Sequence, residues 1–128
     1  MFNQKGREMM VTRQAIFTYA EDTYGITPEY LFKSYPNYAV LKNRQGKWFG
    51  AVMNVPQAKL GLPGTDEIDI LDIKVDPELG SILRAKPGYL PAYHMNKEHW
   101  LTIVLDRQAD AAGLFLLLDS SYALVTKQ

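Results

Sequence analysis

The sequence predicts a single α+β domain in which an antiparallel β-sheet packs against helices. Three observations indicate this class. The chain has 128 residues, an ordinary size for one domain, and its 47% hydrophobic and 22% charged residues are typical of a globular protein. Helical and strand-like periodicities are mixed along its length. The first two strand-like segments are separated only by a short turn, which favours antiparallel pairing.

A helix is expected after Thr12, which has the side chain of an N-cap. Apolar residues from Ile16 to Tyr24 then recur at helical spacing, and Gly25 supplies the residue that commonly ends a helix. A short helical turn is expected over residues 27–36, which begin with Thr-Pro and close with a second proline.

A β-hairpin should follow. Two apolar runs, YAVLKN and KWFGAVMNV, flank the turn sequence RQG, so the turn is expected near residues 44–46. Residues 57–64 have the glycine and proline content of a loop. In the next strand, EIDILDIKVD, the apolar alternation changes phase between Ile70 and Leu71, which predicts a β-bulge near Ile70.

The last third of the chain predicts a short helix, a strand and a long helix. Asp76 is the expected N-cap of the short helix over residues 77–86, with Leu79, Ile82 and Leu83 turned inward. Residues 87–93 should be irregular because they contain two prolines and a glycine. Residues 100–105 are apolar on both sides and predict a fully buried strand, and residues 111–125 carry a continuous apolar stripe at helical spacing.

Several kinds of chemistry are excluded by composition. The chain has no cysteine, so it contains no disulfide, no thiolate zinc site and no cysteine nucleophile. It lacks a glycine-rich phosphate loop and a G-x-S-x-G motif. His94 and His99 are five residues apart, whereas the H-E-x-x-H zinc motif separates its histidines by four. We therefore expect no catalytic residue, no metal site and no cofactor, and a non-enzymatic function.

The distribution of charged residues limits the kinds of partner that the chain can bind. Fourteen basic and fourteen acidic residues cancel, but residues 1–64 hold eight basic and four acidic residues, while residues 65–128 hold six and ten. A neutral chain is a poor non-specific binder of nucleic acid, although one face can still be basic. The N-terminal segment lacks the apolar core of a secretory signal, and no apolar run approaches the ~20 residues of a membrane span. A cytoplasmic location without membrane association is expected.

Residues suited to binding fall in two groups, each of which also has a purely structural interpretation. The predicted hairpin tip is basic and is followed by a tryptophan, which could contact phosphates and stack on a base. The sequence HMNKEHW could form a second contact region or simply a turn that leads into the next strand. The candidate DNA-binding residues are Lys42, Arg44, Lys47, Trp48, His94, Asn96, Lys97 and His99.

The same HMNKEHW stretch carries a resemblance to a known family. YHMNKEHWLTIVLD, followed by LLDSSYALV, resembles the C-terminal signature of the YjbR/MmcQ family of small bacterial proteins. The matching residues in this part of the chain are His94, Asn96, Lys97, His99, Trp100, Thr102, Leu105, Asp106, Asp119, Ser121 and Tyr122. IKVDPELGSILR also resembles the Lys-x-x-Pro-Glu-Leu helix start of that family, at Lys74, Pro77, Glu78 and Leu79.

The resemblance implies a CyaY-like (frataxin-like) sandwich with N- and C-terminal helices, formed by residues 11–128 after a flexible segment at 1–10. It also implies a DNA-binding protein with a double-wing arrangement of hairpins. We expect a monomer or weak dimer. The alternative is a module that binds a protein partner or a small ligand, without a nucleic-acid role. One version of this alternative is weak metal binding by Asp66, Glu67, Asp69 and Asp72.

Overall fold

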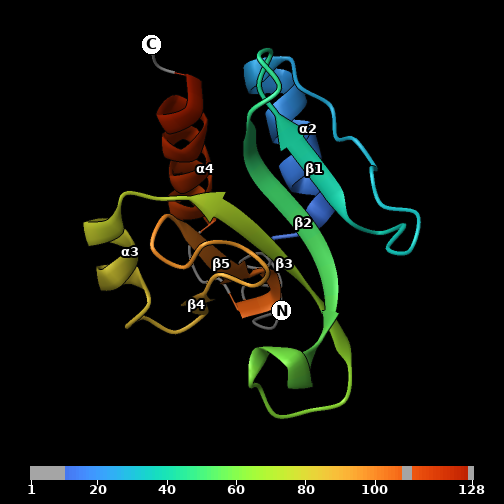
Figure 1. Cartoon of the computed structure of the whole chain (residues 1–128), viewed down its shortest axis with the longest axis vertical. Helices are drawn as coiled ribbons and strands as arrows, with labels where there is room; N and C mark the ends of the chain where they lie inside the picture. Colours follow the sequence, from blue (N-terminus) through green and yellow to red (C-terminus); the bar gives the residue numbers. More distant parts are fainter. Residues whose placement is uncertain (1–10, 108–110, 127–128) are drawn as a thin grey trace, which may run out of the picture.

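Five antiparallel strands form one sheet in the order β1-β2-β3-β5-β4 (Figure 1). The computed structural model describes residues 11–107 and 111–126, so the flexibility expected for residues 1–10 lies outside the described part. The strands are β1 (Ala39–Lys42), β2 (Trp48–Pro56), β3 (Glu67–Lys74), β4 (Tyr89–Pro91) and β5 (Trp100–Val104). The α-helices are α2 (Arg13–Tyr24), α3 (Pro77–Leu83) and α4 (Ala111–Thr126), and 3₁₀ turns occupy Gln57–Leu60 (η1) and Leu105–Arg107 (η2). The predicted α+β class, with an antiparallel sheet and helices, is confirmed.

Helix α2 begins and ends where the sequence predicts. The Thr12 side chain accepts a hydrogen bond from the backbone N–H of Ala15 at 3.1 Å. Gly25 adopts a left-handed backbone with φ of 72°, and its N–H donates to carbonyls of the last helical turn. A side chain at this φ would be strained, which explains why glycine ends the helix.

The segment after α2 differs from its prediction. Residues 27–36 form turns and not a helix, and the backbone of Glu29 makes an isolated antiparallel bridge with Val40 of β1. The two residues exchange backbone hydrogen bonds of 2.9 and 2.8 Å. This long-range pairing satisfies the backbone groups that a helical turn would otherwise have used.

The predicted bulge near Ile70 is also wrong. Strand β3 pairs with β2 without a register shift, and the irregularity of the sheet lies between Leu41 and Lys42 of β1. The apolar phase of β3 changes because both faces of this central strand are buried. Ile70 therefore points to one face and Leu71 to the other without any distortion of the backbone.

The segment between α3 and β5 shows two further differences. Residues 89–91, expected to be irregular, form the edge strand β4, where the missing N–H of Pro91 is tolerated. Helix α3 has the predicted start, but the Asp76 side chain makes no capping bond, and Ile82 is 61% exposed instead of inward-facing.

The two faces of the sheet are covered differently. Buried residues of all three α-helices belong to one apolar cluster on one face, together with Leu71 and Ile73 of β3. The opposite face, here called the loop face, has no α-helical residue in its cluster and is covered by loops. Its buried apolar residues are Ala51, Met53, Val55, Ile68, Ile70 and Val104. In the described part of the chain, no helix is long and apolar enough to cross a membrane.

Candidate functional site

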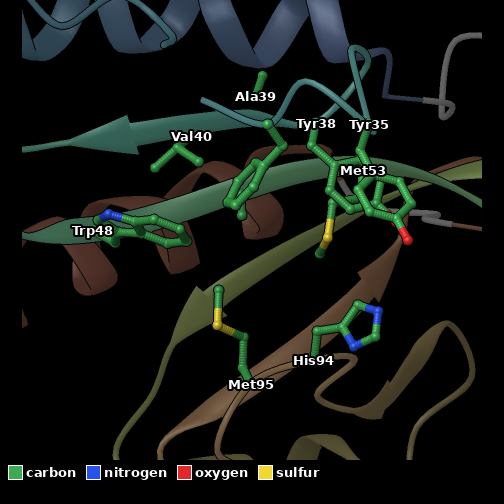
Figure 2. Close-up of a pocket in the computed structure, with 10 residues that line it drawn as sticks. Tyr35, Tyr38, Ala39, Val40, Trp48, Met53, His94 and Met95 are labelled. Atoms are coloured by element: carbon green, nitrogen blue, oxygen red, sulfur yellow. The ribbon is translucent and has the colours of Figure 1, made fainter. Parts of the chain in front are cut away.

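The loop face carries an apolar hollow, here called the aromatic pocket, with a volume of about 260 Å³. Its wall combines two parts of the chain that are far apart in the sequence: residues 32–53, which include the loop before β1 and the strands β1 and β2, and residues 94–95 of the segment 92–99. Figure 2 shows Met95 and His94 rising from that last segment, across from Tyr38 and Met53. The lining residues are Phe32, Tyr35, Tyr38, Ala39, Val40, Trp48, Ala51, Met53, His94 and Met95.

The aromatic walls are accessible and partly ordered by one another. Phe32 is 40% exposed and Tyr35 is 54% exposed, which is unusual for large apolar side chains in the absence of a partner. Phe32 lies edge-on to Trp48, with a centroid distance of 6.2 Å, and Tyr35 stacks on Tyr38 at 4.7 Å. These ring contacts order the walls of the pocket, so that the site is preformed and mostly apolar.

His94 lies where three hollows of the loop face meet. Besides the aromatic pocket, it lines a second hollow of about 340 Å³ and a third of about 590 Å³. Its backbone is left-handed, with φ of 63°, and its ring lies against that of Tyr93 at a centroid distance of 4.0 Å. A positive φ at a residue other than glycine is uncommon and often marks a functional position.

Asp72 is buried in the same face, next to the pocket floor. It pairs with Ala51 of the pocket on one side and with Thr102 of β5 on the other. The Thr102 hydroxyl donates to its Oδ1 at 2.5 Å, whereas its Oδ2 has no hydrogen-bond partner among the described residues. Burial raises the pKa of Asp72 to about 7, although the Thr102 hydroxyl and the charge of Lys97 act in the opposite direction.

The segment 92–99 combines turn-forming and site-lining residues. The Asn96 side chain accepts hydrogen bonds from the backbone N–H groups of Glu98 and His99 at 2.9 and 3.0 Å, so it has the turn-forming role predicted for it. The Lys97 ammonium donates to the carbonyl of Ala92 at 2.8 Å and lines the second hollow. This residue therefore belongs to the site as well as to the turn.

The basic hairpin tip is less available than its sequence suggests. Lys42 forms an ion pair of 3.1 Å with Glu29, while Arg44 and Lys47 have no ion pair with any described residue. The tip is rigidly held, because Asn43 is buried, donates to the carbonyl of Val125 at 3.1 Å and accepts from two backbone N–H groups of the turn.

The predicted second contact region is only partly assembled. His94 and Lys97 line the second hollow, but His99 lines none of the three hollows and lies 3.7 Å from Glu98 on the exposed surface. Trp48 joins His94 in the aromatic pocket. Of the candidate DNA-binding residues, the structure thus brings Trp48 of the hairpin together with His94 of HMNKEHW, which the sequence did not indicate.

The four acidic residues considered for weak metal binding do not gather. Asp69 points to the helix-covered side, where Arg13 donates to its carboxylate at 3.0 Å and Asn54 at 2.9 Å. Burial raises the pKa of Asp69, but the bonds from Arg13 and Asn54 outweigh that effect and hold it below its usual range. Asp72 points to the loop face, and no group of three potential metal-binding side chains occurs in residues 11–107 and 111–126.

The family is established by comparison with known proteins. The model of the YjbR family matches residues 21–124 of this chain. The chain belongs to the YjbR family. The Bacillus subtilis protein YyaQ, described as uncharacterized, is 45% identical over 116 residues, which are 90% of this chain and 98% of YyaQ. Escherichia coli YjbR is 36% identical over 53 residues, which cover 41% of this chain and 45% of that protein.

Solved structures show the same fold. A crystal structure of a Pseudomonas syringae protein is 39% identical, has a TM-score of 0.86 and covers 89% of this chain and 98% of its own. A Deinococcus radiodurans protein with a DUF419 domain is 29% identical, has a TM-score of 0.72 and covers 94% of this chain and 81% of its own.

The residues of the YjbR-like signature that lie in the last helix have a structural role. The Ser121 hydroxyl donates to the carbonyl of Phe49 at 2.6 Å and accepts from the N–H of Lys74 at 2.9 Å, which joins α4 to β2 and β3. The Asp119 carboxylate accepts hydrogen bonds from the hydroxyls of Tyr19 and Tyr24 on α2. In this YjbR domain, these signature residues fasten helices to the sheet and to each other, and line none of the three hollows.

The residues of the site that the sequence analysis missed include Phe32, Tyr35, Tyr38 and Tyr93, whereas Asp72 was considered there only as a metal ligand. A signal for the first three was present in YLFKSYPNY, where large aromatic residues follow no periodicity that would bury them. Asp72 gave a signal as well, because it shares the strand face of Ile68 and Ile70. Tyr93 gave none, because a tyrosine in a segment with two prolines and a glycine fits any loop.

Proposed function

We propose that this YjbR-family chain is a non-enzymatic, cytoplasmic binding domain that takes a flat, mainly apolar group into the aromatic pocket. The observation that carries the proposal is the pocket itself. It is walled by rings and thioethers that are already separated, and two of its large aromatic residues remain substantially exposed. Small-molecule sites are typically concave, mostly apolar and preformed in this way.

The proposal is tested with the neutral fluorescent dye N-phenyl-1-naphthylamine, which brightens in apolar sites. We expect saturable binding to the protein, and roughly tenfold weaker binding to Phe32→Ala, because an aromatic wall of the site is removed. Leu116→Ala is the matched control, since Leu116 is a 68% exposed apolar residue on α4, away from the pocket. Absence of saturable binding, or equal loss in both variants, would overturn the proposal.

DNA binding is the second candidate, and the position of Trp48 favours it. Trp48 lines the aromatic pocket and directly follows Lys47 at the hairpin tip. An unpaired base stacked in the pocket would bring its phosphates toward Arg44 and Lys47. This arrangement supports contact with a single strand more than a wing laid along a duplex, because the third basic residue, Lys42, is paired with Glu29.

Fluorescence anisotropy with labelled single-stranded and duplex oligonucleotides tests this candidate. If Arg44 and Lys47 neutralise two phosphates, log K for the single strand should fall against log salt with a slope of about −1.4. Arg44→Gln with Lys47→Gln should remove the salt dependence, whereas Lys86→Gln with Arg107→Gln, an equal charge change outside the three hollows, should preserve it. Failure to bind either oligonucleotide at ~50 mM salt would exclude the candidate.

A further inference from the structure

The second hollow, here called the lysine hollow, adjoins the aromatic pocket along His94. Its volume is about 340 Å³, and its charged lining residues are Lys59 and Lys97, with no carboxylate. The neighbouring third hollow contains both Lys59 and Glu67, but no ion pair joins them. An apolar site and a cationic site therefore share one wall.

The two ammonium groups are available for an external anion. The Lys97 ammonium donates one of its three protons to the carbonyl of Ala92, and this bond keeps the positive charge at the hollow. The charge of Lys97 acts on the carboxyl of Asp72, which is fully buried and bonded to Thr102. Because burial favours the protonated form of that carboxyl, Asp72 compensates the charge of Lys97 incompletely. Lys59 is exposed on η1 and has no ion pair with a described residue.

We propose that the ligand is an aromatic anion, with its ring in the aromatic pocket and its acidic group in the lysine hollow between Lys59 and Lys97. This inference rests on the function proposed above and adds the charge of the ligand. Ammonium groups on flexible stems suit a carboxylate, sulfonate or phosphate equally, because they act as point charges without a fixed geometry. His94, on the shared wall, would contact the ligand where its ring joins its acidic group.

A matched pair of probes tests the charge requirement. 8-Anilinonaphthalene-1-sulfonate has the ring system of N-phenyl-1-naphthylamine with one added sulfonate. We expect the sulfonate to bind roughly tenfold tighter than the neutral dye, and Lys59→Met or Lys97→Met to reduce that ratio to about threefold or less. Lys86→Met is the control, because Lys86 is an exposed lysine outside the three hollows and should leave the ratio unchanged. Thermal unfolding of Lys97→Met checks that loss of its bond to Ala92 leaves the domain folded, and Lys59→Met tests the site without altering any such bond.

The outcomes separate the two proposals. If the neutral dye binds at the pocket and the sulfonate binds no tighter, the aromatic pocket stands and the anion site is overturned. If Lys86→Met reduces the ratio as much as Lys59→Met, the preference reflects general charge, and the anion site is again overturned. If neither dye binds in a saturable way, the proposed function itself fails.

Discussion

At the scale of single residues, Asp72 is the least ordinary group in the domain. A carboxyl with one satisfied oxygen and one orphaned oxygen is costly to bury in its ionised form. The cost depends on pH, since burial raises the pKa of Asp72 to about 7 from an unfolded value near 3.8. The sequence shows only an acid in a strand. The burial of Asp72 could not be predicted, because it depends on distant segments that cover both faces of the sheet.

Asp72→Asn should therefore change how stability depends on pH. A carboxyl whose pKa is raised in the folded state contributes stability that is fully present below its unfolded pKa and is lost as the pH rises through about 7. Asparagine resembles the protonated acid in shape and does not titrate. The fall in unfolding free energy between pH 4.5 and pH 8.5 should then be smaller in the variant by roughly 2 to 4 kcal/mol. Urea denaturation at both pH values measures this difference.

Asp66→Asn provides the control for that experiment, because Asp66 is an exposed acid next to the same strand. It should leave the pH dependence as it is in the parent protein. A parent whose stability does not decrease across this range would contradict a raised pKa for Asp72.

At the scale of elements, the last helix is attached to the sheet by polar bonds as well as by apolar packing. The predicted stripe of residues 111–125 was sufficient to place α4 on a core, and Leu114 and Leu118 are indeed fully buried. The same periodicity gave no information about Ser121, whose hydroxyl bonds to the backbones of two strands. Helical spacing predicts a buried face, but the bonds that fix the helix position come from distant strands.

Ser121→Ala and Ser120→Ala form a matched pair on this helix. The first substitution leaves the part-buried N–H of Lys74 and the buried carbonyl of Phe49 without their shared partner, and should lower the unfolding free energy by about 2 kcal/mol. The second removes an exposed hydroxyl and should change stability by less than about 0.5 kcal/mol. Chemical denaturation compares them, and equal effects would show that the two bonds of Ser121 contribute nothing measurable.

At the scale of the whole molecule, the fold could be predicted more fully than the site. Local patterns identified α2, the hairpin, the strand after Trp100 and α4, because each has a period, a cap or a turn of its own. Strand β4 was missed because Pro87 and Pro91 are typical of loops, whereas the pairing of β4 with β5 depends on residues distant in the sequence. The aromatic pocket was missed for a similar reason, since Phe32, Trp48 and His94 meet only after the sheet has formed.

The order of strands in the sheet also predicts which strand loses its hydrogen bonds last. β3 pairs with a neighbour along its whole length and on both sides over residues 70–73, whereas β4 is a three-residue edge strand. Native-state hydrogen exchange should show the slowest amides in β3, with opening energies equal to the global unfolding free energy. Amides of β4 and of residues 30–37 should exchange by local opening. Uniform protection across all of these segments would contradict this order.

The bond from Asn43 to Val125 has a consequence for synthesis of the chain. It joins residues 82 positions apart, and the two bonds of Ser121 to the strands join residues 47 and 72 positions apart. On a ribosome, the hairpin of β1 and β2 is made long before residues 121–125 emerge. Until then the hairpin turn lacks its helical partner, and the part of the sheet face that α4 covers stays open. The nascent sheet is therefore a surface that a chaperone can recognise, and native packing is completed only after α4 is released.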